Sequence, residues 1–414
     1  MKSLVEISFG CFLLVCISCS SSTQKQTEEH AKADSLNTAT VAKLPHHFKG
    51  FKTGMPINYI PCNQDSTETY CLYLPKDYDT SKAWPVIYFF DAHARGKLPV
   101  KKYHELAEKY QAIFVGSNNS QNGLKGELYD KIVNDLMGTT REILNIDDKK
   151  IMACGFSGGA KVAASAAMKS NDISAVIGCA APMDISQIGS SYFNFVGIVG
   201  KGDFNYWDMV ELNLSLNKTG LKHHLLTFDG IHEWPDLNTI DQAMAIATEA
   251  KEASAIKDAE IATNLREKEF NAKNSYIKAF QSQGPAYWMS AISALQTGYK
   301  NGAGDEKWMN RRLLSFINMM AYLKTAELLN GNHLEESEGF LKAFKASDPK
   351  NPDGPFLTAD YYALKGDKPK AIASLNEALK MGYDDYAHFS TDPMLASLKG
   401  ESGYAAVKAK LLGD

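Results

Sequence analysis

One pentapeptide in the sequence has the pattern of a serine nucleophile. Residues 155–159 read Gly-Phe-Ser-Gly-Gly, and they separate a short apolar run from an alanine-rich, helix-like stretch. In such a turn the serine occupies a strained junction between a strand and a helix, and the helix N-terminus lends positive potential to an oxyanion. We therefore predict that Ser157 attacks an electrophilic carbon and that the backbone amide of Gly158 stabilises the resulting oxyanion.

Two residues further along the chain have the types that a serine needs for its activation. Asp203 and His232 each follow shortly after an apolar run that is typical of a buried strand. A serine hydroxyl is a weak nucleophile until a neutral imidazole accepts its proton, and a carboxylate fixes the tautomer of that imidazole. These positions predict a triad of Ser157, His232 and Asp203, with Asp184 and Asp208 as alternative acids.

The elements that must position these side chains alternate between strands and helices over residues 45–250. Strands are predicted at 70–74, 85–90, 112–116, 150–155, 175–179, 195–200 and 224–228, and helices at 102–110, 129–144, 160–169, 207–219 and 239–249. Short, continuous apolar strands separated by amphipathic helices are typical of a parallel sheet that is covered on both faces. The sequence therefore predicts an α/β domain with a doubly wound, mostly parallel sheet.

Beyond residue 250 the hydrophobic period is helical throughout. Small and large apolar positions recur with a spacing of 34 residues, at Thr325, Leu328, Ser337, Leu341 and Phe344 and again at Ala359, Tyr362, Ala371, Leu375 and Ala378. This period is that of tetratricopeptide repeats. We predict an all-α, tetratricopeptide-like domain over residues 251–414. Because helical repeats bury their apolar faces against neighbours, we expect its first helix to pack on the α/β domain.

The N-terminus has the features of a bacterial secretion signal. Lys2 precedes a short apolar stretch, and residues 16–19 read Cys-Ile-Ser-Cys, which resembles a lipobox. Residues 1–18 are therefore expected to be removed and Cys19 to be lipidated, although a plain signal peptide cut near the same place is the alternative. Residues 19–44 are rich in Ser, Thr, Gln and Glu, which predicts a flexible tether.

The remaining cysteines divide into two pairs. Cys154 and Cys179 lie in apolar runs, where buried, inert thiols are expected. Cys62 and Cys71 flank a turn-like stretch, and a disulfide between them is plausible in an oxidising compartment. No CxxC pair or His/Cys cluster suggests a metal site.

The composition argues against a nucleic-acid-binding protein and against a membrane protein with several spanning helices. The chain of 414 residues carries 44 basic and 48 acidic side chains, so its net charge of −4 offers no electrostatic surface for nucleic acid. After the first 20 residues, no apolar run approaches the roughly 20 residues that a membrane helix needs. Contact with a membrane is expected through the lipid anchor only.

With their order of serine, acid and histidine and the Gly-x-His-x-Trp ending at 230–234, residues 68–250 resemble the α/β-hydrolase superfamily, in particular its secreted esterase, feruloyl-esterase-like and dienelactone-hydrolase-like branches. The C-terminal part resembles tetratricopeptide repeats. The pairing behind a lipobox looks like surface or periplasmic lipoproteins of Bacteroidetes-type bacteria. The resemblance implies a serine hydrolase that needs no metal or other cofactor.

The resemblance also implies a second oxyanion donor in the loop after an early strand. This donor would be the backbone amide of Ala92 or of His93. The side chains of His93 and Arg95 would contact the substrate or brace the loop, and Asn118 and Trp234 are further candidates for substrate contact.

Taken together, the sequence predicts a lipoprotein of the cell envelope, in the outer membrane or periplasm. Its expected activity is hydrolysis of a carboxylic ester in a small-molecule or carbohydrate-linked substrate. A serine peptidase with the same triad is one alternative. Another is a non-catalytic platform whose helical domain recruits a protein partner.

Overall fold

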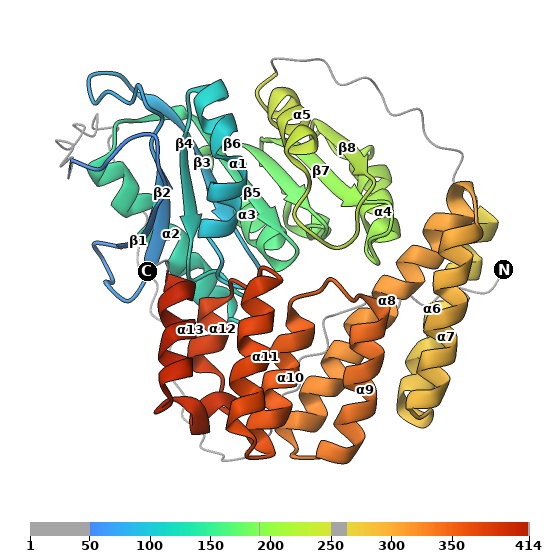
Figure 1. Cartoon of the computed structure of the whole chain (residues 1–414). Coiled ribbons are helices and arrows are strands. Elements are labelled where there is room, and N and C mark those ends of the chain that lie inside the picture. Colours follow the sequence, from blue (N-terminus) through green and yellow to red (C-terminus); the bar gives the residue numbers. More distant parts are fainter. Residues whose placement is uncertain (1–49, 190, 250–262, 413–414) are drawn as a thin grey trace, which may run out of the picture. The chain divides into compact units, whose positions relative to one another are not determined.

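The computed structural model describes residues 50–189, 191–249 and 263–412 (Figure 1). All of them fall within the unit of residues 46–414. The predicted signal peptide, Cys19 and the predicted tether lie outside the described residues. Within the described residues, no helix is both long enough and apolar enough to cross a membrane.

A single sheet organises the first part of the described chain. Its strands are β1 (Ile57–Pro61), β2 (Thr69–Tyr73), β3 (Trp84–Phe90), β4 (Ile113–Ser117), β5 (Ile146–Phe156), β6 (Ile173–Cys179), β7 (Asn194–Gly200) and β8 (His223–Phe228). They lie in the order β1-β2-β4-β3-β5-β6-β7-β8. β2 pairs antiparallel with both β1 and β4, and the other pairs are parallel. The predicted mostly parallel sheet is therefore confirmed.

Helices cover both faces of this sheet, because successive side chains of a strand point to opposite sides. They are α1 (Lys97–Tyr110), α2 (Gly126–Ile143), α3 (Gly158–Lys169), α4 (Tyr206–Leu216) and α5 (Leu237–Ala247). In β3, Val86 and Tyr88 join a core with α2, α3 and α4. Ile87 and Phe89 join a separate core with α1 and α5. The central strands are thus buried on both sides, as their continuous apolar runs indicate.

The predicted disulfide between Cys62 and Cys71 is not present, because both thiols are free. Cys62 packs into the core that contains α2, whereas Cys71 packs into the core that contains α1. The two side chains thus lie on opposite faces of the sheet. Cys154 and Cys179 are buried as expected, and burial raises the pKa of the Cys154 thiol.

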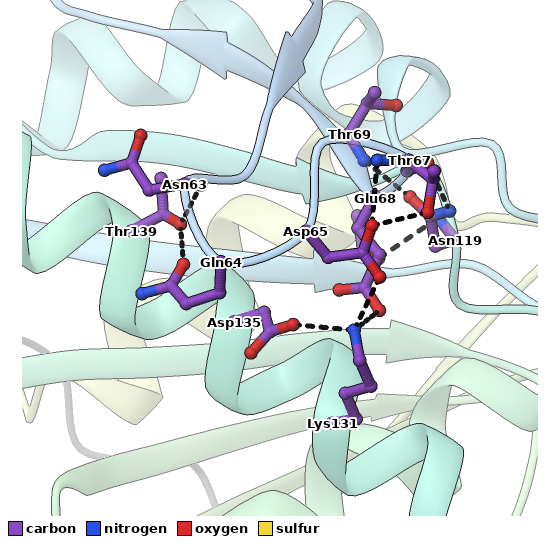
Figure 2. Close-up of polar contacts among 11 residues, drawn as sticks. Asn63, Gln64, Asp65, Thr67, Glu68, Thr69, Asn119, Lys131, Asp135 and Thr139 are labelled. Atoms are coloured by element: carbon purple, nitrogen blue, oxygen red, sulfur yellow. Dashed lines mark hydrogen bonds and ion pairs between the residues drawn. The ribbon is translucent and has the colours of Figure 1, made fainter.

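The turn between β1 and β2 is fastened to α2 by polar contacts (Figure 2). The Nζ of Lys131 lies 2.9 Å from a carboxylate oxygen of Asp65, 2.7 Å from one of Glu68 and 2.8 Å from one of Asp135. The backbone N–H of Asn63 donates to the hydroxyl of Thr139 at 2.9 Å. These contacts hold the edge hairpin that β1 and β2 form.

Residues 263–412 contain helices and no strand within the described chain (Figure 1). We call these residues the helical segment. Its α-helices are α6 (Thr263–Ser282), α7 (Pro285–Asn301), α8 (Gly304–Asn330), α9 (Leu334–Ser347), α10 (Asp353–Leu364), α11 (Lys368–Lys380), α12 (Tyr386–Thr391) and α13 (Ser402–Leu412). The predicted repeats fall on the helix pairs α8–α9 and α10–α11, and all the repeat positions are buried except Tyr362, which is half-buried. Their assignment to the tetratricopeptide class stays a prediction.

Candidate active site

Ser157 lies in a sharp turn between β5 and α3. Its backbone has φ 54° and ψ −122°, a conformation that costs a non-glycine residue about 1–3 kcal/mol. The turn is possible because glycines surround it. A side chain at Gly155 would collide with the carbonyl of Gly159, and one at Gly159 would collide with the carbonyl of Phe90. The sequence motif therefore corresponds to a turn that exposes the serine at the end of a central strand.

The side chains of Ser157, His232 and Asp203 form one hydrogen-bonded chain. His232 Nε2 lies 3.0 Å from Ser157 Oγ, and His232 Nδ1 lies 3.0 Å from each carboxylate oxygen of Asp203. Asp203 is fully buried, whereas the His232 side chain keeps 21% of its surface exposed. The ring of Phe204 stacks on the imidazole at 4.4 Å. This geometry allows a proton to pass between the hydroxyl and the imidazole.

Within the described residues, neither of the two alternative acids bonds to His232, whose Nδ1 meets Asp203. The carboxylate of Asp184 accepts hydrogen bonds from the backbone N–H and hydroxyl of Ser186 and from the amide of Gln187, so its own turn satisfies it. Asp208 lies in the first turn of α4, where its residue is exposed to solvent. Asp203 is the acid that the structure brings to His232.

The second candidate oxyanion donor is the amide of Ala92. The backbone N–H of His93 donates to Asp91 Oδ1 at 2.8 Å, so the expectation that His93 could be the donor is corrected. Ala92 lies beside Gly158, since a Cβ built on that glycine would stand 3.7 Å from the Ala92 Cβ. In the described part of the chain, the amides of Ala92 and Gly158 have no acceptor.

Asp91, to which the sequence analysis assigned no role, organises this loop. Its fully buried carboxylate accepts from the N–H of His93, from Nε and Nη2 of Arg95 at 2.8 and 3.1 Å, and from Nε1 of Trp234 at 2.7 Å. Burial by itself raises the pKa of Asp91, but the charge and hydrogen bonds of Arg95 outweigh it and hold the pKa below its usual range. An aspartate at a strand exit, with an arginine four residues later, is the sequence signal that could have indicated this.

The residues predicted to contact substrate serve mainly as supports. Trp234 is only 4% exposed and bonds to Asp91, so its indole supports the loop from within the core. Arg95 is held by Asp91 and lies 3.6 Å from Asp384 in the helical segment.

The Asn118 side chain is also held by hydrogen bonds within the fold. Its side-chain amide donates to the carbonyl of Asn58 at 2.9 Å and to the hydroxyl of Thr69 at 3.2 Å, which ties it to the β1–β2 edge of the sheet. The loop residue that does reach the site is Asn122, a residue that the sequence analysis did not single out. Its side-chain oxygen stands against Gly158, and its N–H donates to the carbonyl of Ala92 at 2.8 Å.

The sheet and the site together define an α/β-hydrolase-like arrangement. The serine follows β5 at a strained turn, the acid follows β7, and the histidine follows β8, which is the chain order of that fold. The sheet has the predicted doubly wound, mostly parallel architecture. The structure also brings together the side chains of Ser157, Asp203 and His232, as predicted.

Comparisons with known proteins show similar solved structures, but no family model and no curated protein matches the chain. A fluorophosphonate-binding serine hydrolase of Staphylococcus aureus is 15% identical over 47% of this chain and 96% of its own, with a TM-score of 0.39. An esterase of Pyrobaculum calidifontis is 13% identical over 48% of this chain and 87% of its own, with a TM-score of 0.38. A ferulic acid esterase is 16% identical over 44% of this chain and 92% of its own, with a TM-score of 0.36.

Proposed function

We propose that this protein is a serine hydrolase that cleaves carboxylic esters through an acyl-enzyme intermediate. The observation that carries the proposal is the hydrogen-bonded chain from Ser157 through His232 to the buried Asp203. Beside the serine lie the amides of Ala92 and Gly158, which have no acceptor among the residues that the structure describes. Neither feature alone would suffice. A serine needs the imidazole to lose its proton, and the tetrahedral intermediate needs donors for its negative oxygen.

In the acylation step, Ser157 Oγ attacks the ester carbonyl carbon while His232 Nε2 accepts the hydroxyl proton. The carbonyl oxygen becomes negative and accepts hydrogen bonds from the amides of Ala92 and Gly158. Asp203 stabilises the imidazolium that forms. The imidazolium then gives its proton to the alcohol oxygen as the carbon–oxygen bond breaks, and the alcohol leaves.

Deacylation repeats this chemistry with water. His232 accepts a proton from a water molecule whose oxygen attacks the acyl carbon, and a second tetrahedral intermediate forms in the same oxyanion site. When this intermediate collapses, the proton returns to Ser157 Oγ and the carboxylic acid is released. The enzyme is thereby restored to its starting state.

The proposed setting is the cell envelope, with the enzyme held by a lipid on Cys19 and acting on a small-molecule or carbohydrate-linked ester. The support for this part is the N-terminal sequence alone, with its lysine, its apolar stretch and its Cys-Ile-Ser-Cys segment.

A fluorophosphonate probe tests the proposal directly, because it reacts with activated serines. Wild-type protein is expected to react and to hydrolyse members of a panel of acyl esters, while Ser157→Ala should do neither. A wild-type protein that neither reacts nor turns over any ester would refute the proposal and favour a non-catalytic platform. Cleavage of peptides with no cleavage of esters would instead identify a peptidase.

A further inference from the structure

Side chains of the helical segment reach the loop that carries the candidate oxyanion donor. The imidazole Nδ1 of His93 lies 3.2 Å from Oδ2 of Asp385, in the turn before α12. The neighbouring Asp384 lies 3.6 Å from Nη1 of Arg95. His93 directly follows Ala92, so a contact that fixes His93 also restricts where the amide of Ala92 points.

Asp385 is itself held rigidly enough to act as an anchor. Its side chain is only 7% exposed, and its second oxygen, Oδ1, accepts the backbone N–H of His388 at 2.8 Å as the N-cap of α12. One oxygen is thus fixed by its own helix and the other faces His93. Burial and the charge of Arg95 lower the pKa of the His93 imidazole, but the hydrogen bond to Asp385 and the charges of Asp91 and Asp385 outweigh them and raise the pKa.

A second set of contacts reaches the loop that carries the acid. Arg312 Nη1 donates to the carbonyl of Lys201 at 3.0 Å, and the hydroxyl of Ser315 donates to the carbonyl of Gly202 at 2.8 Å. Both donors lie on α8 and are buried. The two carbonyls immediately precede Asp203, so α8 fixes the backbone from which the acid projects.

We propose that the helical segment is a working part of the active site, and that Asp385 is a positioning residue that acts through His93 on the oxyanion donor Ala92. This inference rests on the proposed function, because it assigns a role in stabilising the oxyanion of that reaction. A donor displaced by a fraction of an ångström stabilises the transition state less, although substrate binding in the ground state changes little.

The test compares Asp385→Ser with Asp367→Ser in the full chain. Asp367 is the N-cap of α11 and pairs with Lys370 of the same helix, so it is a matched capping aspartate. Serine also caps helices well, so both variants should fold. Of the two substitutions, only Asp385→Ser removes a contact with His93, because the shorter serine side chain cannot extend to the imidazole. We expect Asp385→Ser to lower kcat about tenfold or more, with KM within about twofold of wild type, and Asp367→Ser to leave both unchanged.

His93→Ala distinguishes positioning from a general structural effect. If Asp385 acts through His93, then His93→Ala alone should reproduce the loss of kcat, and Asp385→Ser added to it should cost less than about twofold more. Fully additive losses would overturn the inference, as would an unchanged kcat in Asp385→Ser or an equal loss in Asp367→Ser. His93→Ala removes no helix cap, so it gives an answer even if Asp385→Ser does not fold.

The wild-type measurement separates this inference from the proposed function. Absence of ester turnover and of fluorophosphonate reaction in wild type would refute the proposed function. An active wild type whose kcat is unaffected by Asp385→Ser would leave that function standing and refute the role of Asp385 alone.

Discussion

The carboxylate beside His232 is placed by the way the chain leaves β7. The N–H of Asp203 donates to the carbonyl of Gly200 at 3.0 Å, and the N–H of Asn205 donates to Asp203 Oδ1 at 2.8 Å. This tight turn directs the side chain inward, where both oxygens meet the imidazole. The acid is thus fixed by its backbone as well as by its partner.

Replacing this acid tests the assignment residue by residue. We expect Asp203→Asn to lower kcat for an ester by about four orders of magnitude, because an amide favours the wrong tautomer of His232. Asp184→Asn is the matched control and should cost little, since Asp184 bonds within its own turn. Steady-state kinetics on both variants measure this, and a larger loss from Asp184→Asn would contradict the triad.

Asp91 should contribute to stability as well as to the loop geometry. It is fully buried and meets Arg95, so Asp91→Asn removes one partner of a largely buried ion pair, which costs about 3–5 kcal/mol at neutral pH. The Lys222–Glu249 pair is exposed, and Glu249→Gln is a control that should change the free energy of unfolding little.

The pH dependence of this effect has a definite sign. The pKa of Asp91 is lowered in the folded protein, so its contribution is fully present above the ordinary aspartate pKa of about 4 and is lost as the pH falls through the lowered value. In denaturant unfolding at a series of pH values, the difference between wild type and Asp91→Asn should therefore be constant near neutrality and shrink in acid. A difference that grew in acid would contradict the ionised Asp91.

At the scale of elements, a buried ion pair joins α6 and α8 where they meet α4. Glu269 Oε2 accepts from Arg312 Nε and from Trp207 Nε1, each at 2.8 Å, and both charged side chains are buried. Lys273, also on α6, donates to the carbonyl of Phe204 at 2.9 Å. The prediction that the first helix after residue 250 packs on the α/β domain is confirmed by these contacts for α6, the first helix of the described residues beyond that point.

Breaking this pair should be costly. Arg312→Met removes the guanidinium partner of the buried Glu269 carboxylate, which keeps only the Lys273 ammonium 3.1 Å away, and we expect a loss of about 3 kcal/mol in the free energy of unfolding. Lys268→Met is the control, because the pair of Lys268 with Glu306 also joins α6 to α8 but is exposed on both sides and should contribute little. Equal losses in the free energy of unfolding for the two substitutions would show that the buried pair stabilises the fold no more than the exposed pair does.

Strands were predictable where their residues are apolar on both faces. β3 and β7 were found because their runs are continuous, whereas β1 reads Ile-Asn-Tyr-Ile-Pro and is mostly half-buried at the edge of the sheet. β5 begins at Ile146 and not near 150, because exposed residues such as Asp148 and Lys149 extend it beyond the core. An edge strand, or the exposed end of a long strand, contains few apolar residues in a row, so its sequence does not mark it clearly as a strand.

The site was predictable to the same degree. Ser157 and Asp203 follow the strongly apolar strands β5 and β7, and His232 follows the shorter apolar run of β8. The topology brings all three to one edge of the sheet. The choice between Ala92 and His93 required the hydrogen bond to Asp91, and the role of Asp385 required the helical segment to be placed on the loop. Contacts between residues so far apart in the chain leave no local pattern in the sequence.

At the scale of the whole molecule, the contacts that join the two parts predict that the α/β part needs the helical segment. A chain ending at residue 250 would lose Arg312 and Ser315 from the acid loop and Asp385 from the oxyanion loop. It would also uncover the rings of Tyr206 and Trp207, over which the guanidinium of Arg312 lies. We expect such a chain to be less soluble and to have a lower kcat than the full chain. Equal kcat values for the two chains would contradict this dependence.

The last prediction concerns the membrane anchor, which lies outside the described residues. If Cys19 is lipidated, Cys19→Ala should abolish metabolic labelling with palmitate and release the protein from membranes. Activity should be unchanged, because the predicted tether separates the cysteine from the fold.

Cys16→Leu is the matched control: it also removes a cysteine, but it brings the segment closer to the usual lipobox, so labelling should persist. Labelling that survives in Cys19→Ala, or that disappears in Cys16→Leu, would contradict the anchor at Cys19. Secretion of unlabelled wild-type protein would instead favour a plain signal peptide cut near the same place.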